Sequence, residues 1–467
     1  MWLLLASWLE MPVSTTHSCV GGVIGMTLMS RNSDCVVWNE EGIECNFDTF
    51  PCAKGVLSIV ISWVLSPVAS GIMAAFLYFV TYHVVLKNPE TAFFRAKLFF
   101  PLIVAFTMMV NSIFFLLKGS KGKAEDMGTD DIVSAAKEGD LWPAFRVGFI
   151  VFAVTGFLAA VITPYLASQI KVAAPGSDIE IVEVEVGKDA ATGTGLTSAV
   201  ALEAENADVD KVLSQDSTAS GIHNHVTRHD ERCEEMFKYV QVFTAVVDSY
   251  SHGANDVANA MGPFSAVYMT YKYGEVVKKQ DLGDDMYWIL AIGGLGIVVG
   301  LATYGYKIIA AIGVKLTAIT PSRGYCIELG AAFVIIYGTS KGWPLSTTHC
   351  QVGATVGVGL FEGAAGVNKW VLFKCCIGWV ITLVVVGLTT ALLVGPNPDQ
   401  FGVPNEFVRN CQTDRGGFCY DDKDDFCGVE SYSCGDLTLD LNAMCSNSNY
   451  TDVLAALVSL PAGAVSS

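Results

Sequence analysis

The chain has 467 residues, of which 52% are hydrophobic and 16% charged, whereas a soluble domain usually carries about a quarter charged residues. The net charge of −18 lies mostly in two segments, residues 171–232 and 397–451, each with a net charge of −7. The composition excludes a soluble globular protein, and the acidity argues against any partnership with nucleic acid. We expect an integral membrane protein in contact with lipid, with the plasma membrane as its location.

The first element is an apolar stretch that ends in the sequence PVSTTH, Pro12 to His17. A glycine-punctuated apolar stretch follows, so the hydroxyl groups fall where one half-helix ends and the next begins. Proline at a helix start and serine or threonine at its cap are typical of such a junction. Residues 1–9 lack the basic leader of a signal peptide, and the chain is expected to begin partway through a structural element.

Five later windows are apolar and long enough to cross a bilayer core, which takes roughly 20 residues of helix. They are Val56–Val85, Leu98–Leu117, Ala144–Ile170, Met286–Ile309 and Trp370–Val394. Other apolar stretches contain polar or glycine-rich interruptions, which favours broken or re-entrant helices. The expected fold is therefore an all-α polytopic membrane protein.

Two soluble segments are rich in cysteine. The first is the loop from Ser30, and the second is the C-terminal segment, which also carries a glycosylation acceptor at Asn449. Such clusters predict disulfides facing an oxidising compartment, and the acidic segment 171–232 is then expected on the cytoplasmic side. The cysteines concerned are Cys35, Cys45 and Cys52 in the loop, and Cys411, Cys419, Cys427, Cys434 and Cys445 in the tail.

The sequence SHGANDVANAMGP, Ser251 to Pro263, places a carboxylate in an apolar context. An acid at membrane depth costs several kcal/mol and rarely persists without a partner. Asn255 and Asn259 are four residues apart, on one helix face beside Asp256, so amide and carboxylate oxygens can converge. Oxygen ligands suit a hard cation such as sodium. The alternative is an acid held by hydrogen bonds between helices.

Several other titratable residues lie near these elements and are candidates for either structural pairing or ion relay. One acid follows a basic residue by five positions, at Arg323 and Glu328. The full set is Glu10, His17, Asp248, Arg323, Glu328 and His349.

A second copy of the first motif, PLSTTH, runs from Pro344 to His349. The segments Pro12–Gly25 and Pro344–Gly357 match at eight of fourteen positions, and ISWVLSP at Ile61 is echoed by IGWVITL at Ile377. Two related halves are typical of transporters built from inverted repeats, with a site between them near the bilayer midplane. The predicted organisation is a first membrane repeat (1–170), an acidic cytoplasmic loop (171–232), a second repeat (233–395) and a cysteine-rich extracellular segment (396–467).

The duplicated hydroxyl clusters predict an anion site. Free N–H groups at a half-helix start, together with serine and threonine hydroxyls, form a donor-rich pocket that suits an oxyanion. Neither motif contains lysine or arginine, so an anion beside Asp256 would require a cation as well. The hydroxyls in question are Ser14, Thr15, Thr16, Ser346, Thr347 and Thr348.

Two other interpretations of the motifs are open. The hydroxyls could simply cap helices and bond to their own backbone. A hydrolase with Ser14 as nucleophile and His17 as base is the third interpretation, although it offers no reason for the duplication. Glycine pairs, Gly21 with Gly25 and Gly353 with Gly357, are expected to allow close helix packing.

At GANDVANA (Gly253–Ala260) and the paired PVSTTH and PLSTTH, the sequence resembles the inorganic phosphate transporter (PiT) family of cation-coupled symporters. TPSRGYCIELGAA, Thr320 to Ala332, is also similar to that family. The resemblance implies phosphate as substrate, sodium or protons as co-transported ion, no enzymatic activity and no further cofactor. A homodimer is one oligomeric state that it allows.

Carried over by position, the resemblance makes the six motif hydroxyls phosphate ligands. It makes Asn255 and Asp256 sodium ligands, with Asn259 supporting them. The family has a GANDVAN-like segment in each half, and here the first is missing. The sequence is therefore expected to be N-terminally incomplete. Otherwise one cation site has been lost, and the protein is a phosphate receptor or sensor that no longer cycles.

Overall fold

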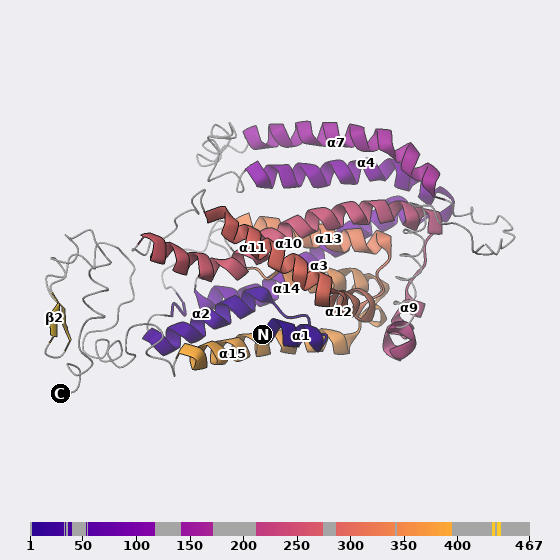
Figure 1. The fold of residues 1–467 in the computed structure, drawn as a ribbon. Coiled ribbons are helices and arrows are strands. Elements are labelled where there is room, and N and C mark those ends of the chain that lie inside the picture. The colour runs from indigo at the N-terminus through magenta and orange to yellow at the C-terminus, as the bar shows by residue number, and fades with distance from the viewer. Residues whose placement is uncertain are drawn as a thin grey trace, which may run out of the picture.

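The computed structural model describes residues 2–31, 33, 36–39, 53, 55–116, 142–170, 212–273, 286–340, 343–394, 432–434 and 437–439. Nearly all of these lie in helices (Figure 1). In chain order the elements are α1 (Trp2–Trp8), α2 (Thr15–Arg31), α3 (Val56–Thr81), η2 (Tyr82–Leu86), α4 (Pro89–Phe114), α7 (Trp142–Gln169), α9 (Ser217–His225), α10 (Glu231–Tyr273), α11 (Tyr287–Gly300), η5 (Leu301–Gly305), α12 (Tyr306–Ala310), η6 (Ala311–Leu316), α13 (Pro321–Ser340), α14 (Thr347–Gly359), η7 (Leu360–Glu362), η8 (Ala364–Gly366), α15 (Lys369–Val394), β1 (Tyr432–Cys434) and β2 (Leu437–Leu439).

Five helical segments in the described part of the chain have the length and apolar composition needed to cross a membrane. Each overlaps one of the five windows predicted from the sequence, and two of them extend well beyond the predicted ends, the second at its start and the fourth at its end. The segments are Val56–Leu86, Pro89–Ile113, Trp142–Gln169, Tyr287–Leu316 and Lys369–Val394. The all-α polytopic fold is confirmed.

The first motif lies at a break between two helices, as predicted. Helix α1 ends in a Schellman motif, in which the Met11 amide donates to the Ala6 carbonyl and the Glu10 amide donates to the Ser7 carbonyl. Glu10 occupies the position that usually takes glycine, and its φ of 57° is left-handed. Helix α2 then begins at Thr15, so Ser14 stands at its N-terminal cap.

The second motif lies at a matching break. Helix α13 ends at Ser340 and α14 begins at Thr347, with Ser346 as N-cap in an extended conformation. Pro344 stands two residues before this cap, whereas the sequence suggested proline at the helix start itself. It therefore stiffens the approach to the helix and is not part of its first turn.

The motif helix of each repeat packs against a membrane span of the other repeat. Helix α2 packs against α15, and α14 packs against α3, so each motif helix contacts the span that follows the other motif (Figure 1). Such a reciprocal arrangement is the one that a two-fold relation between the halves produces.

Glycines permit both of these contacts, as the sequence predicted. A Cβ on Gly25 would lie 2.1 Å from the Gly387 carbonyl oxygen, and one on Gly357 would lie 2.2 Å from that of Gly71. The obstructing atoms are backbone, so only glycine allows the helices to approach this closely.

Helix α10 carries the GANDVANA sequence within a single 43-residue helix. It packs along α13 and also contacts α4, α11, α2 and α14, so it adjoins both motif helices. Helices α4 and α7 form a pair at one side of the bundle (Figure 1). The central position of α10 allows its polar face to reach both half-helix junctions.

The soluble segments are described only in part. Helix α9 lies in the described end of the predicted loop 171–232, and β1 pairs antiparallel with β2 in the tail. The side chains of the two predicted cysteine clusters, and Asn449, lie outside the described residues. The cysteines expected in apolar helices, Cys19, Cys326, Cys350, Cys375 and Cys376, do lie in helices and carry free thiols.

Candidate functional site

The N-termini of the two motif helices meet. The hydroxyls of Ser14 and Ser346 are 2.8 Å apart, although the residues are 332 positions apart in sequence. Both side chains are buried, with 0% and 2% exposed. Each hydroxyl also accepts a hydrogen bond from its own helix, from the His17 amide at 3.3 Å and the His349 amide at 3.4 Å. The two serines therefore cap their helices and join them.

The Asp256 carboxylate accepts hydrogen bonds from one threonine of each motif. The Thr15 hydroxyl donates to Oδ1 of Asp256 at 2.9 Å, and the Thr347 hydroxyl lies 3.2 Å from Oδ1 and 3.4 Å from Oδ2. These bonds draw α2, α10 and α14 together around one carboxylate. Capping alone does not account for the threonines, because their hydroxyls point across to another helix and not to their own backbone.

The remaining polar groups of the motifs link the same three helices. The Asn259 amide donates to the Thr16 hydroxyl at 2.9 Å, and Thr16 and Thr348 donate to the backbone carbonyls of the opposite motif at 3.4 Å. Among the described atoms, the buried amide nitrogen of Asn255 has no hydrogen-bond partner. The predicted anion ligands and the predicted cation ligands thus share one site.

The motif histidines lie directly behind the serines. The rings of His17 and His349 make an edge contact with centroids 4.6 Å apart. The Trp63 ring lies beside His17 with centroids 4.7 Å apart, and the Trp379 ring lies beside His349 with centroids 3.7 Å apart, both in tilted contacts. The two tryptophans occupy equivalent places in the ISWVLSP and IGWVITL echoes, but the sequence analysis did not single them out.

This arrangement does not favour the hydrolase interpretation. Nδ1 of His17 faces the Trp379 carbonyl oxygen at 3.3 Å, whereas the Ser14 hydroxyl contacts the His17 backbone and Ser346. No hydrogen bond between the Ser14 hydroxyl and the His17 ring occurs in the described part of the chain. The imidazole is therefore not placed to take the serine proton.

The site is rich in oxygen, and among the described residues no lysine or arginine side chain forms a hydrogen bond with its members. The described residues contain no cluster of three or more His, Cys, Asp or Glu side chains suited to a metal ion. Sodium does not require such a cluster, because hydroxyl, amide and carbonyl oxygens are adequate ligands for a hard cation. The groups that could hold it are the oxygens of Asp256, Asn255 and Asn259 and the neighbouring threonine hydroxyls.

The further acids are not part of this hydroxyl cluster. Glu10 is exposed and forms an ion pair with Lys315. Asp248 is 3.3 Å from His252, one turn along α10. Glu328 accepts a hydrogen bond from the Thr244 hydroxyl at 2.5 Å. Each of these three acids therefore has a polar partner outside the hydroxyl cluster.

Arg323 does not pair with Glu328, the acid that follows it by five positions. Arg323 instead pairs with Glu362 and donates to the Thr227 carbonyl oxygen at 3.0 Å. Residues five apart on a helix point about 140° away from one another, since each residue turns the helix by about 100°. Arg323 therefore faces η7 at the end of α14, while Glu328 faces α10.

This ion pair closes the end of α14 that lies away from the hydroxyl cluster. The Thr227 hydroxyl donates to Glu362 at 2.9 Å, and the Arg323 guanidinium lies over the Tyr78 ring at 5.4 Å. Burial would raise the pKa of Glu362, but hydrogen bonds from Thr227 and the charge of Arg323 outweigh it and hold the pKa below its usual value. Nothing in the sequence around Glu362 indicated this partner.

Comparisons with known proteins agree with one another. The sequence profile of the phosphate transporter family matches residues 1–390. A protein of Pyrococcus abyssi, inferred to be a phosphate permease, is 30% identical over 397 residues, covering 84% of this chain and 75% of its own length. The phosphate-repressible phosphate permease of Neurospora crassa is 27% identical over 490 residues, covering 85% of this chain and 81% of its own.

A solved structure is also similar. It is described as the sodium-dependent phosphate transporter, and it superposes with a TM-score of 0.58 at 26% sequence identity. The match covers 84% of this chain and 75% of the other. The family profile, which matches residues 1–390, includes both PxSTTH motifs and Asp256.

Proposed function

The chain belongs to the phosphate transporter family, and we propose that it carries inorganic phosphate across the plasma membrane in symport with sodium. It is an integral membrane protein with five apolar spans in its described part, and the plasma membrane is the expected location of a permease. The observation that carries the proposal is the meeting of both half-helix N-termini at Asp256.

The hydroxyl cluster supports an oxyanion as the substrate. The six motif hydroxyls and the first N–H groups of α2 and α14 supply donors from two opposed helix starts. Phosphate is tetrahedral, so its oxygens can accept from both starts at once. On binding, it would replace the bond between Ser14 and Ser346, and each serine would direct its hydroxyl to a phosphate oxygen.

Asp256 supports coupling to a cation. A phosphate beside this carboxylate would face strong repulsion in a cavity of low dielectric constant, and two helix ends supply only about half a charge each. Sodium bound by Asp256 and Asn255, with Asn259 supporting, would remove that repulsion. Thr15 and Thr347 donate hydrogen bonds to Asp256. A cation that binds this carboxylate would therefore change the position of both threonines, which stand at the starts of the two phosphate-binding helices.

The test is uptake of radiolabelled phosphate into liposomes containing the purified protein. We expect uptake to require an inward sodium gradient and to fall at least about 100-fold in Asp256→Asn, since the partly buried carboxylate would no longer balance the charge of the bound sodium. Asp216→Asn is the matched control. Asp216 caps α9 through the amides of Thr218 and Ala219, and its loss should leave uptake unchanged.

Other outcomes would contradict the proposal in distinct ways. Uptake driven by a pH gradient without sodium would show proton coupling at the same site. Phosphate binding without flux would identify a receptor or sensor. Full sodium-driven uptake by Asp256→Asn would remove this carboxylate from the coupling mechanism.

A further inference from the structure

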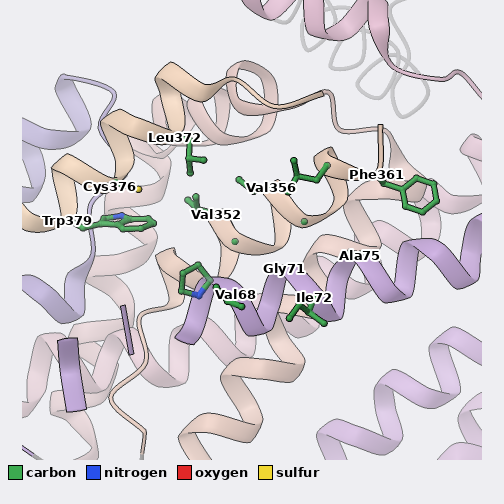
Figure 2. A pocket seen from close by; sticks show the side chains of 14 residues that line it. Val68, Gly71, Ile72, Ala75, Val352, Val356, Phe361, Leu372, Cys376 and Trp379 are labelled. Atoms are coloured by element: carbon green, nitrogen blue, oxygen red, sulfur yellow. The ribbon is translucent and has the colours of Figure 1, made fainter. Parts of the chain in front are cut away.

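An apolar groove of about 580 Å³ lies between α3, α14 and α15 (Figure 2). Its volume is within the range of roughly 300–1,000 Å³ that ligand sites occupy. The side chains along it are hydrocarbon apart from the Cys376 thiol and the Trp379 ring. Those that shape it most clearly in Figure 2 are Val68, Ile72, Val352, Val356, Leu372 and Cys376.

The groove opens sideways from two membrane spans. Val68 and Ile72 of α3 are 52% and 67% exposed, and Leu360 at the end of α14 is 53% exposed. Both α3 and α15 have the length and composition of spans, so this rim lies at the depth of the lipid tails. A ligand entering here would therefore come from the bilayer, and the part that fills the groove would be a hydrocarbon chain.

Positive charge stands at one end of the groove. Helix α15 begins with Lys369, which is exposed and lies one turn before Leu372, on the same face of the helix. Lys374 lies 5.5 Å from the Trp370 ring, as expected of residues at the membrane interface. The acid nearest in sequence to the groove lining, Glu362, is already paired with Arg323. The end of the groove near Lys369, where α15 begins, therefore suits a negatively charged headgroup.

We propose that the groove binds one acyl chain of an anionic phospholipid, with the lipid phosphate at Lys369. The chain would run from Leu372 toward Trp379, between α15 and α3. It would also contact α14 at Val352 and Val356, which follow the phosphate-site residue Ser346 by two to three turns.

The position of the groove gives this lipid a specific consequence. Helices α3 and α14 form one closely packed pair and α2 and α15 form the other, and the groove is lined by members of both. A lipid chain there fills the space between the two pairs. Its presence would fix the spacing of α14 from α15, and with it the distance between the two hydroxyl clusters.

Cys376 provides a reporter inside the groove, because it is exposed and has a free thiol. The full chain would be placed in lipid nanodiscs of phosphatidylcholine, with or without phosphatidylglycerol, and treated with a membrane-permeant maleimide. Peptide-resolved mass spectrometry would follow the modification of Cys376. We expect phosphatidylglycerol to slow it about tenfold, which corresponds to about 1.4 kcal/mol of protection.

Three variants make the test specific. Lys369→Glu should abolish the protection by phosphatidylglycerol. Lys87→Glu makes the same charge change at the end of η2, outside the groove lining, and should leave it intact. Ile72→Trp should fill the groove and protect Cys376 in either lipid.

Equal modification rates in both lipids would overturn the proposal. So would protection that rises with protein density and yields a cross-link between two Cys376 residues, because the occupant would then be a second copy of the chain. Neither measurement involves phosphate, so failure here is distinguishable from failure of the proposed transport.

Discussion

The two motif helices have matching sequences and junctions but different surroundings. Helix α14 is buried along most of its length between α3 and α13, and its far end is closed by the ion pair of Glu362 with Arg323. Helix α2 packs mainly on α15, and its outer side chains are open, with Val23 and Met29 43% and 44% exposed. The comparison indicates that α14 is the anchored member of the pair and α2 the freer one.

The largest effects are expected at the glycine contacts, which should distinguish the two helices most clearly. Gly357→Ala and Gly25→Ala each place a methyl group against backbone, 2.2 Å and 2.1 Å from a carbonyl oxygen. Overpacking of this kind costs up to about 3 kcal/mol. We expect Gly357→Ala to lower the melting temperature more, because α14 is enclosed and cannot move away.

The control for this comparison is Gly22→Ala. Its methyl group would meet the Thr390 hydroxyl at 3.5 Å, an ordinary contact, and alanine favours a helix over glycine, so the melting temperature should not fall. If Gly357→Ala and Gly25→Ala lower the melting temperature equally, the two helices are anchored equally.

The next largest effects are expected at the threonines that reach Asp256. Thr15→Val removes the hydrogen bond of 2.9 Å, and Thr347→Val removes the longer contacts of 3.2 Å and 3.4 Å. A hydrogen bond to a charged group contributes about 1.5–3 kcal/mol, so we expect initial phosphate uptake to fall about tenfold in Thr15→Val and less in Thr347→Val.

Thr15→Ser and Thr347→Ser keep the hydroxyl group, so each should retain most of the native uptake. Both threonines act on one carboxylate. The loss of uptake in the double valine variant, expressed as a free energy, should therefore be smaller than the sum of the losses in the two single variants. Strict additivity, measured as initial rates at fixed sodium, would show that the two motifs act separately.

A moderate effect is expected where α14 is closed by Glu362. Glu362→Gln removes the charge that pairs with the buried Arg323, at a cost of about 1–2 kcal/mol. The pKa of Glu362 is lowered in the folded state, so its contribution to stability is present above the unfolded-state pKa of about 4.3 and is lost as the pH falls through the folded-state value.

The melting temperatures of the native protein and Glu362→Gln should therefore differ at pH 7 and converge below about pH 4. A difference that is independent of pH would assign the loss to packing and not to charge.

The smallest effect is expected at the ion pair beside α2. Glu10→Gln removes the exposed pair with Lys315, and exposed pairs contribute about 0–1 kcal/mol. The melting temperature should change little, in contrast to Glu362→Gln. A loss as large as that of Glu362→Gln would show that the α1–α2 junction is anchored as firmly as α14.

The sequence by itself determined the local features of this protein. Hydropathy located five spans, and the order of proline, serine and threonine located two helix junctions, because both properties depend on residues within a few turns of one another. The repeat also identified the glycine pairs, since a small residue every four positions marks one helix face. The carboxylate at Asp256 was identified because an acid in an apolar context is costly.

Only the tertiary structure decided which of these features meet. The reciprocal packing of α2 on α15 and α14 on α3, the bond between Ser14 and Ser346, and the ion pair of Arg323 with Glu362 join segments that are far apart in the chain. Trp63 and Trp379 stood within a visible repeat, yet their contact with the histidines had no local signal. Such partners depend on how whole helices cross, and that geometry follows from the packing of many side chains at once.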